Sequence, residues 1–393
     1  MNALQQALQH ALKRRDETQT RRTLSSITRD GPYLWRNGTQ LLDVSSNDYL
    51  GLADHPIVKQ RAAEWAERYG AGARASRLVT GTLALHHHIE ERLATFKSSE
   101  AALLFASGWQ ANASIIPALS ALSRQETGAP AQFYMDRLNH ASLHHGCLSA
   151  GVHQKRFRHN DLTHLEELLS RDKDTTGLRF IVTESVFSMD GDQADIPALR
   201  ALADHFGAFL YIDEAHATGV LGPEGRGLGH GLSDITMSTA SKALGGMGAF
   251  VTGSRALCDY LLNQASGFIY STALPPALLG AIDAALDLIP TLEQERHTLH
   301  AHASKLRKRL HLIGRSTSTS TTQIIPVIIG ESDQALSIAK MLEHAGFLVA
   351  AIRPPTVPPH TARLRIALNS QISAADIDRL GDALLKYCSL ENP

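Results

Sequence analysis

Short apolar runs alternate with helical periodicity from about residue 100 to about residue 270 of this chain. Each run is bounded by Gly, Ser, Asp or Asn, which predicts buried strands. The predicted strands are AALLF (101–105), FYMD (133–136), RFIVTE (179–184), AFLYID (208–213), DITMST (234–239) and AFVTG (249–253). Helical spacing fills the intervals at 110–122, 140–149, 162–170 and 197–206. Apolar strands that alternate with helices predict an α/β fold with a mostly parallel sheet, covered by helices on both faces.

The pattern changes after about residue 277. A long helical stretch reaches residue 312, and the polar run STSTSTTQ (316–323) follows it. The remaining chain predicts a smaller α+β unit, with strands at 324–329, 347–352 and 363–368 and helices at 333–345 and 374–388. We therefore expect an N-terminal helix and arm over residues 1–45 that packs with the small domain, a large domain over 46–285, and a C-terminal small domain over 286–393.

Charge and composition narrow the class of protein. Lys and Arg number 38 against 39 Asp and Glu, so the chain lacks the basic excess expected of a protein that binds nucleic acid or an anionic membrane. Leu4, Leu8 and Leu12 predict an amphipathic N-terminal helix rather than a signal peptide, and no apolar run has the length of a membrane span. The three cysteines form no C-x-x-C pair, so we expect a cytoplasmic protein.

Polar loops follow five of the predicted strands, at 107–112, 136–142, 185–192, 213–216 and 238–246. Ligands of a parallel sheet bind beyond the carboxyl ends of its strands, so these loops should meet at one edge. Ser107 and Gly108 open a helix, whose free N–H groups can bind an anion. Asp213 supplies a carboxylate, and Lys242 lies in a small, uncharged loop that favours a lowered pKa.

This set of groups suits pyridoxal 5′-phosphate (PLP). The cofactor's aldehyde needs a lysine amine, for which Lys242 is placed, and its pyridine nitrogen needs a carboxylate, for which Asp213 is placed. Its phosphate needs a helix N-terminus and hydroxyl groups. His140 is placed to lie over the ring.

The 20 histidines raise the alternative of a metal site. His140 and His144 have the i, i+4 spacing of a helical zinc pair, but no acidic third ligand is near them in the sequence. We therefore expect no metal. The chain also lacks a G-x-G-x-x-G motif after a strand and a G-x-x-x-x-G-K-[ST] motif, which argues against a dinucleotide site and an ATP-binding loop.

Several motifs resemble those of the α-oxoamine synthases, which are fold-type-I PLP enzymes. They are SSNDYLGL (45–52), SRLVTGT (76–82), NHAS (139–142), VFSMDGD (186–192), YIDEAHATGVLG (211–222), STASKALGG (238–246) and IRPPTVPPHTARLRIAL (352–368). They cover nearly the whole chain in the family's order. The resemblance implies a large domain with a seven-stranded type of sheet, a smaller α+β domain, and a homodimer with its active site at the subunit interface.

The resemblance also implies a role for each matching residue. Lys242 would hold the cofactor as a Schiff base and move the substrate's Cα proton, and Asp213 would pair with the pyridinium. His216 would bond the ring hydroxyl, and His140 would stack on the ring. The residues expected to hold the phosphate or ring hydroxyl are Gly108, Trp109, Ser188 and Thr239, with Thr272 reaching the partner subunit's phosphate. The residues expected to bind substrate are Arg365 and Asn47 at the amino-acid carboxylate, Arg21 at the thioester entrance and Thr356 along the acyl tunnel.

The implied activity is that of a PLP-dependent acyltransferase, which condenses an amino acid with an acyl thioester and releases CO2. The 352–368 stretch favours L-alanine and a pimeloyl thioester, carried by coenzyme A or by an acyl carrier protein. The alternative is a sister enzyme of the glycine C-acetyltransferase, 5-aminolevulinate synthase or serine palmitoyltransferase type.

Overall fold

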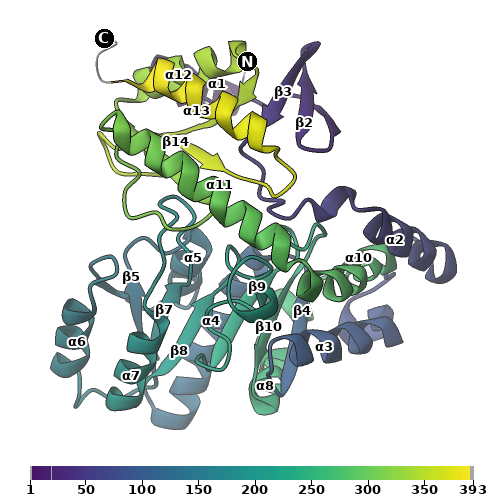
Figure 1. Cartoon of the computed structure of the whole chain (residues 1–393). Helices are drawn as coiled ribbons and strands as arrows, with labels where there is room; N and C mark the ends of the chain where they lie inside the picture. The colour runs from purple at the N-terminus through teal and green to yellow at the C-terminus, as the bar shows by residue number, and fades with distance from the viewer. Residues whose placement is uncertain (1, 19, 390–393) are drawn as a thin grey trace.

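A sheet of seven strands forms the centre of the computed structural model, which describes residues 2–18 and 20–389 (Figure 1). Its strand order is β4-β10-β9-β8-β7-β5-β6. The strands are β4 (Ala101–Phe105), β5 (Gln132–Asp136), β6 (Lys155–Phe157), β7 (Arg179–Glu184), β8 (Phe209–Asp213), β9 (Ile235–Thr239) and β10 (Ala249–Gly253). Of these seven, β10 runs antiparallel to both of its neighbours. The predicted α/β class with a mostly parallel sheet is therefore confirmed, and β6 is a strand that the sequence pattern did not predict.

Helices cover both faces of this sheet because its strands are apolar on both sides. Phe133 and Met135 of β5 pack in one cluster with α4, α5 and α8, whereas Tyr134 packs on the other face with α6 and α7. On that second face, α3 and α10 cover the β4 end. The helices of this domain are α2 (Pro56–Tyr69), α3 (Ala84–Phe96), α4 (Gly108–Thr127), α5 (Ala141–Ser149), α6 (Leu162–Arg171), α7 (Ile196–Phe206), α8 (Arg255–Gln264), α9 (Ser266–Ile269) and α10 (Pro276–Leu288).

Two smaller sheets lie above the large one in Figure 1, together with helices α11 (Glu293–Leu312), α12 (Ser332–His344) and α13 (Ala374–Cys388). One has the order β11-β14-β13, and the other has the order β1-β2-β3-β12. Their strands are β1 (Thr28–Asp30), β2 (Tyr33–Arg36), β3 (Thr39–Asp43), β11 (Ile324–Gly330), β12 (Phe347–Leu348), β13 (Ala350–Ile352) and β14 (Ala362–Ala367). Strand β3 from the N-terminal arm pairs in parallel with β12 from the C-terminal part. The domain limits at residues 45 and 285 stay a prediction.

Two sequence predictions for the C-terminal part are wrong in detail. The single strand expected over 347–352 is divided, because β12 pairs with β3 while β13 pairs with β14 in the other sheet. The long helical stretch is interrupted by a short 3-10 turn at Ile289–Thr291. Pro290 lies in this turn, and proline cannot donate the backbone hydrogen bond that a continuous α-helix needs.

The predicted N-terminal helix is present as α1 (Ala3–Glu17). Its leucines Leu4, Leu8 and Leu12 remain 66%, 55% and 42% exposed, so the apolar stripe of α1 is left uncovered by the described part of this chain. Within the described ranges, none of the helices combines the length and the apolar character that crossing a membrane requires.

A buried ion pair fixes the turn that follows β8. Lys97, at the end of α3, places its Nζ 2.5 Å from Oε2 of Glu214, and their side chains are 2% and 0% exposed. The ammonium also donates to Thr218 Oγ1 at 2.8 Å and to the carbonyl of Arg226 at 2.6 Å, while the Gly229 N–H donates to the other oxygen of Glu214. This cluster ties α3 to the 213–229 segment, which carries Asp213 and His216.

Replacing Lys97 should therefore destabilise the fold strongly. In Lys97→Met the Glu214 carboxylate stays buried without its cation, and we expect the free energy of unfolding to fall by roughly 3–5 kcal/mol. Urea denaturation would measure this change, and the double variant Lys97→Met/Glu214→Leu should recover most of it. The matched control is Lys13→Met, whose partner Glu17 lies 3.9 Å away on an exposed helix face. If Lys97→Met cost no more than that control, the buried ion pair would not be what holds α3 to the turn after β8.

Candidate active site

A cavity of about 230 Å³ lies at the carboxyl ends of the parallel strands. It is formed by the start of α4, the ends of β7, β8 and β9, and the loops after β5 and β9. Seven of the predicted site residues line it: Gly108, Trp109, His140, Asp213, His216, Thr239 and Lys242. The other lining residues are Ser107, Asn112, Ser142, Glu184, Ala215, Met237 and Ser241. The loops expected to converge on one edge of the sheet therefore do so.

Asp213 ends β8 with its carboxylate held by two donors. Asn112 donates from Nδ2 at 2.9 Å, and the backbone N–H of Ala215 donates at 2.9 Å. The Asn112 amide is itself oriented, because the Tyr211 hydroxyl donates to its Oδ1 at 2.6 Å and its Nδ2 also reaches Ser142 Oγ. Asp213 is therefore a buried carboxylate that two donors fix in place at the base of the cavity.

Lys242 and His216 are in direct contact. Lys242 Nζ lies 2.7 Å from His216 Nε2, and His216 Nδ1 lies 2.6 Å from the hydroxyl of Tyr49. Burial lowers the pKa of His216 well below its usual range, and the positive charge of Lys242 lowers it further. A neutral ring with its proton on Nδ1 satisfies both contacts, because Nε2 then accepts from the lysine and Nδ1 donates to Tyr49. Burial also lowers the pKa of Lys242 to about 8, although Asp213 and Glu184 oppose this shift.

Arg365 joins this series of contacts from β14. Its Nη2 donates to Asn47 Oδ1 at 3.3 Å, and the Tyr49 hydroxyl donates to the same oxygen at 3.1 Å. Its Nε donates to the carbonyl of Ser188 at 2.6 Å. The arginine is 6% exposed, and the hydrogen bonds through Asn47, Tyr49 and His216 connect it to Lys242. Ser188 does not itself line the cavity, and its contact with Arg365 is made by its backbone.

His140 and Trp109 form one wall of the cavity. Their rings meet edge to face with centroids 6.1 Å apart, and His140 is the N-cap residue of α5. Its Nδ1 lies 2.8 Å from Ser142 Oγ, which orients the imidazole. Burial lowers the pKa of His140, and the charge of Lys242 acts in the same direction. A neutral, flat ring at this wall has the shape needed to cover one face of an aromatic cofactor.

The opposite end of the cavity has the donors that a phosphate needs. Ser107 caps α4 by accepting from the Gln110 N–H at 3.2 Å, so the 20-residue helix begins at the cavity with Gly108. A helix N-terminus carries free N–H groups and partial positive charge. The hydroxyls of Thr239 and Ser241 lie 2.7 Å apart beside it. With a carboxylate at the base and a lysine at the side, these residues fit PLP in both size and chemistry.

Six predicted residues do not line this cavity: Ser188, Asn47 and Arg365, whose contacts are given above, and Thr272, Thr356 and Arg21. Thr272 pairs with Ser76 in an isolated bridge and lines a separate, smaller cavity together with Gln110 of α4. Thr356 lines a separate cavity of about 250 Å³ that is also lined by Arg15, Arg22 and Arg353. Arg21 does not line that cavity, and its Nη1 donates to Asp16 at 2.8 Å. The expected roles of these residues, like those of the residues inside the cavity, stay predictions.

Sequence reasoning missed Glu184, Asn112 and Tyr49 as site residues. Glu184 ends β7 in register with Asp213 on β8, so the rule that selected Asp213 could also have selected Glu184. Asn112 lies one helical turn after Gly108, which places both at the same side of α4. Burial, together with the adjacent charge of Asp213, raises the pKa of Glu184 well above its usual range. Tyr49 lies within the SSNDYLGL motif, but 167 residues separate it from His216, so no local pattern predicts their contact.

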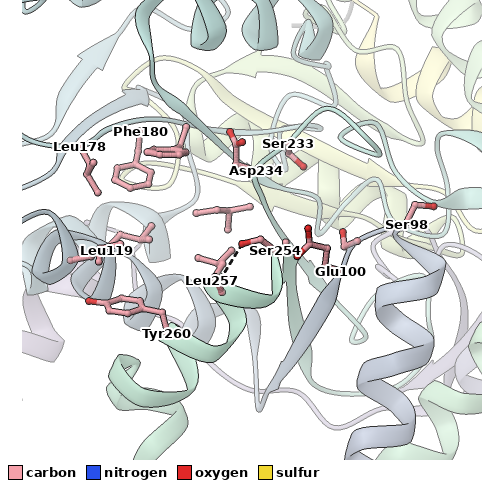
Figure 2. Close-up of a pocket in the computed structure, with 16 residues that line it drawn as sticks. Ser98, Glu100, Leu119, Leu178, Phe180, Ser233, Asp234, Ser254, Leu257 and Tyr260 are labelled. Carbon is pink, nitrogen blue, oxygen red and sulfur yellow. Dashed lines mark hydrogen bonds between the residues drawn. The ribbon is translucent and has the colours of Figure 1, made fainter. Parts of the chain in front are cut away.

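Figure 2 shows another cavity, of about 620 Å³, at the opposite edge of the large sheet. Phe180, Phe209 and Ile235 line it, and they lie at the amino ends of β7, β8 and β9. It contains none of the predicted site residues. Nowhere in residues 2–18 and 20–389 do three His, Cys, Asp or Glu side chains come together as a metal site would require.

Comparison with known proteins agrees with the geometry of the site. Residues 39–384 match the family model "Aminotransferase class I and II". The chain is 58% identical to the 8-amino-7-oxononanoate synthase of Gluconacetobacter diazotrophicus, over 96% of this chain and 95% of the relative. It is 46% identical to the enzyme of the same name from Geobacter sulfurreducens, over 89% of each chain.

Solved structures extend the comparison. A serine palmitoyltransferase from S. paucimobilis with a bound PLP–myriocin aldimine superposes with a TM-score of 0.89 and 26% identity, over 98% of each chain. An 8-amino-7-oxononanoate synthase from Francisella tularensis superposes with a TM-score of 0.74 and 26% identity, over 88% of this chain and 96% of that chain. The resemblance to α-oxoamine synthases and the fold-type-I class are thus confirmed. The chain belongs to the class I and II aminotransferase family and, within it, to the family of the 8-amino-7-oxononanoate synthases that it matches over nearly its whole length.

Proposed function

We propose that this protein is a PLP-dependent acyltransferase that condenses L-alanine with a pimeloyl thioester and yields 8-amino-7-oxononanoate, CO2 and the free carrier, a step of biotin biosynthesis. The names of relatives at 58% and 46% identity support the assignment. The structural observation that carries it is the hydrogen-bonded series Lys242–His216–Tyr49–Asn47–Arg365. This continuous chain of hydrogen bonds connects a lysine amine to an arginine that can bind a carboxylate.

PLP, when bound, supplies an electron sink for the electron pairs released at the alanine Cα. Asp213 would accept a hydrogen bond from the pyridine nitrogen and keep that nitrogen protonated. The α4 N-terminus, Thr239 and Ser241 would bind the phosphate, and His140 would cover one face of the ring. These contacts would orient the cofactor within the cavity of about 230 Å³.

Lys242 would hold the cofactor's aldehyde and would then move the proton at the alanine Cα. The neutral His216 accepts from Nζ at 2.7 Å, and this contact fixes the direction of the amine. Arg365 binds the alanine carboxylate until that group leaves as CO2, with Asn47 beside it. Because Arg365 is almost fully buried, its ion pair with the substrate is shielded from water and strengthened.

The thioester approaches from the cavity that Thr356 lines. Arg15, Arg22 and Arg353 line the same cavity, which gives it a positive lining suited to an anionic carrier. Both coenzyme A and an acyl carrier protein meet this requirement. Arg21 lies on the same N-terminal segment, paired with Asp16, and we keep it as a residue of the entrance.

A homodimer would complete the site. Thr272 follows Ser271, whose hydroxyl accepts from Gln110 in the first turn of α4, and we assign Thr272 to the partner subunit's phosphate. Exposed apolar side chains surround the Ser76–Thr272 bridge and the start of α4: Leu78, Val79, Trp109 and Tyr270. Their exposure ranges from 48% to 84%, which a second copy of the chain would reduce. We place the dimer in the cytoplasm, where the three free cysteines stay reduced.

Product analysis tests the assignment. The purified protein with L-alanine and pimeloyl-CoA or a pimeloyl acyl carrier protein should release CO2 and 8-amino-7-oxononanoate in equal amounts. Glycine and serine should turn over far more slowly, and Lys242→Ala should give no product. Turnover of serine or glycine with another acyl thioester, and none of alanine with either pimeloyl carrier, would assign the protein to a sister enzyme.

The lowered pKa of Lys242 predicts how the apoprotein takes up PLP. Only the neutral amine can attack the aldehyde, so the loading rate should rise about tenfold per pH unit below pH 8 and become constant above it. Stopped-flow absorbance of the lysine-bound cofactor between pH 6 and about 10.5 would measure the rate. The control Lys242→Ala should show no such absorbance. A midpoint near 10.4, the value of an ordinary lysine, would mean that burial does not lower this pKa.

A further inference from the structure

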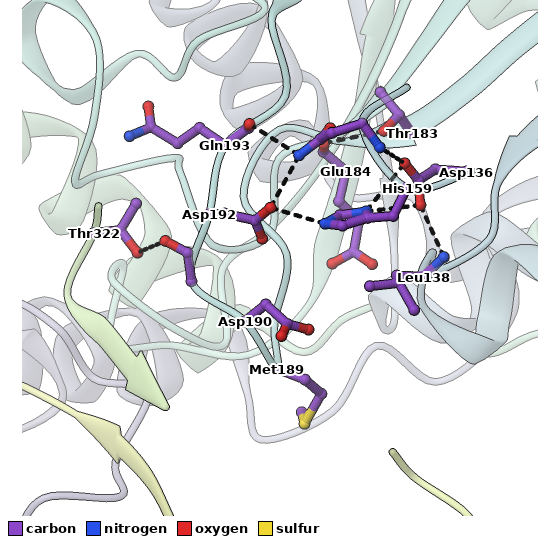
Figure 3. Close-up of polar contacts among 12 residues, drawn as sticks. Asp136, Leu138, His159, Thr183, Glu184, Met189, Asp190, Asp192, Gln193 and Thr322 are labelled. Carbon is purple, nitrogen blue, oxygen red and sulfur yellow. Dashed lines mark hydrogen bonds and ion pairs between the residues drawn. The ribbon is translucent and has the colours of Figure 1, made fainter. Parts of the chain in front are cut away.

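His159 lies between the buried carboxylates of Asp136 and Asp192 (Figure 3). Its Nδ1 lies 3.0 Å from Asp136 Oδ1, and its Nε2 lies 2.8 Å from Asp192 Oδ2. Asp136 and Asp192 are 0% and 3% exposed. An ionised carboxylate can only accept hydrogen bonds, so a ring that satisfies both must carry a proton on each nitrogen. His159 is therefore an imidazolium.

The surroundings of His159 support this charge. Burial on its own would lower the pKa of His159, but hydrogen bonds and the charges of Asp136 and Asp192 together raise it to about 9. Asn160 reinforces the arrangement, since its backbone N–H donates to Asp136 and its Nδ2 donates to Asp192, both at 2.9 Å. The imidazole meets the ring of Phe187 edge to face, with centroids 4.4 Å apart.

His159 thus bridges Asp136 and Asp192, and the Asp136 end of this bridge is connected to His140. Asp136 ends β5, and its Oδ1 accepts from the Leu138 N–H at 2.8 Å while its carbonyl accepts from the Asn139 N–H at 3.2 Å. These bonds shape the short turn that places His140 at the start of α5, on the wall of the cavity. The carboxylate that holds the turn is thus the one held by His159.

The Asp192 side of the bridge leads to Arg365. Asp192 closes the 186–192 loop, because its carbonyl accepts from the Phe187 N–H at 3.0 Å. The same loop presents the Ser188 carbonyl to Arg365 Nε at 2.6 Å. A shift of this loop would therefore move the Ser188 carbonyl that holds Arg365 in place.

We propose that His159 is a positioning residue, whose imidazolium joins Asp136 to Asp192 and so sets the spacing between His140 over the cofactor ring and Arg365 at the amino-acid carboxylate. The proposal rests on the function proposed above for the site, and on two ring contacts made to two different loops. His159 does not line the cavity, so it would touch neither substrate nor cofactor. Its removal should relax two parts of the site that are far apart in the sequence.

The experiment compares the PLP-loaded His159→Gln and Lys155→Met variants. Glutamine keeps an uncharged NH2 group that can donate to one carboxylate, but its other polar atom is a carbonyl oxygen, which cannot donate to the second. Lys155 provides a matched control, because it lies on β6, close to His159 in the sequence, and pairs with Asp172 at 2.5 Å without contact to either loop. The readouts are the KM for the amino acid, the KM for the thioester, the circular dichroism of the bound cofactor and the melting temperature.

We expect His159→Gln to raise the amino-acid KM about tenfold and to change the cofactor's circular dichroism, with the thioester KM unchanged. Lys155→Met should leave the two KM values and the dichroism at wild-type levels even if it lowers the melting temperature equally. In His159→Gln/Asp192→Asn an uncharged amide pair can rebuild the link, and the amino-acid KM should return part of the way.

The proposal would be overturned if His159→Gln kept the wild-type KM and dichroism, or if Lys155→Met changed them equally. NMR of the unmodified holoenzyme gives a test that needs no variant, because both ring nitrogens of His159 should carry protons at pH 7 and a singly protonated ring would contradict the bridge. The KM is read with whichever amino acid turns over, so a wrong assignment of alanine as substrate would leave this test valid.

Discussion

The Asp213 carboxylate lies buried at the end of β8, in the middle of a seven-stranded sheet, where little water can stabilise its charge. Protein donors replace the water. Asn112 and the Ala215 N–H bind the two carboxylate oxygens, and Tyr211 orients the asparagine from within the same strand. A buried charge that is held in this way is costly to move, and the cavity is built around it. The parallel strands bring the loops with Lys242 and His140 to the same edge.

A second carboxyl group at this edge of the sheet lies in surroundings that disfavour its charged form. Glu184 ends β7 in register with Asp213, and burial next to that charge raises its pKa well above the usual range. Two adjacent strand ends thus place two buried carboxyl groups side by side, and only that of Asp213 is held by Asn112 and the Ala215 N–H. Lys242 lines the same cavity as Asp213, and hydrogen bonds through His216, Tyr49 and Asn47 connect it to the buried Arg365. The site therefore concentrates charge at defined points in an otherwise apolar sheet.

Much of the cavity follows from the sequence because its residues lie at strand ends. Gly108, His140, Asp213 and Lys242 each come directly after an apolar run, and parallel packing alone brings them together. The same rule could also have predicted Asn112 and Glu184 as site residues. Tyr49 and Arg365 could not be placed from periodicity, because they reach the site through segments that pair only in the folded protein; Arg365 was identified by family resemblance.

In the fold, too, some elements can be predicted from the local sequence pattern, whereas others depend on residues far apart in the chain. The runs at 101–105 and 249–253 are strands as predicted, since burial on both faces makes them continuously apolar. The 347–352 run is divided between two sheets, and its division depends on β3, which lies about 300 residues away in the chain. The hairpin β2–β3 was missed because its apolar pattern is short. Leu34, Leu41 and Leu42 form its buried core, and its remaining positions are polar or half exposed.

The protonation state of the bound cofactor's pyridine nitrogen tests the central claim most directly. Nitrogen-15 NMR of the protein loaded with labelled PLP reports whether this nitrogen carries a proton. If Asp213 is the fixed negative charge of the site, the nitrogen should be protonated in the wild type throughout pH 6–8 and unprotonated in Asp213→Asn, whose shape is the same and whose charge is absent. An identical nitrogen signal in the two proteins would contradict the account, because the charge of Asp213 would then have no effect on the cofactor.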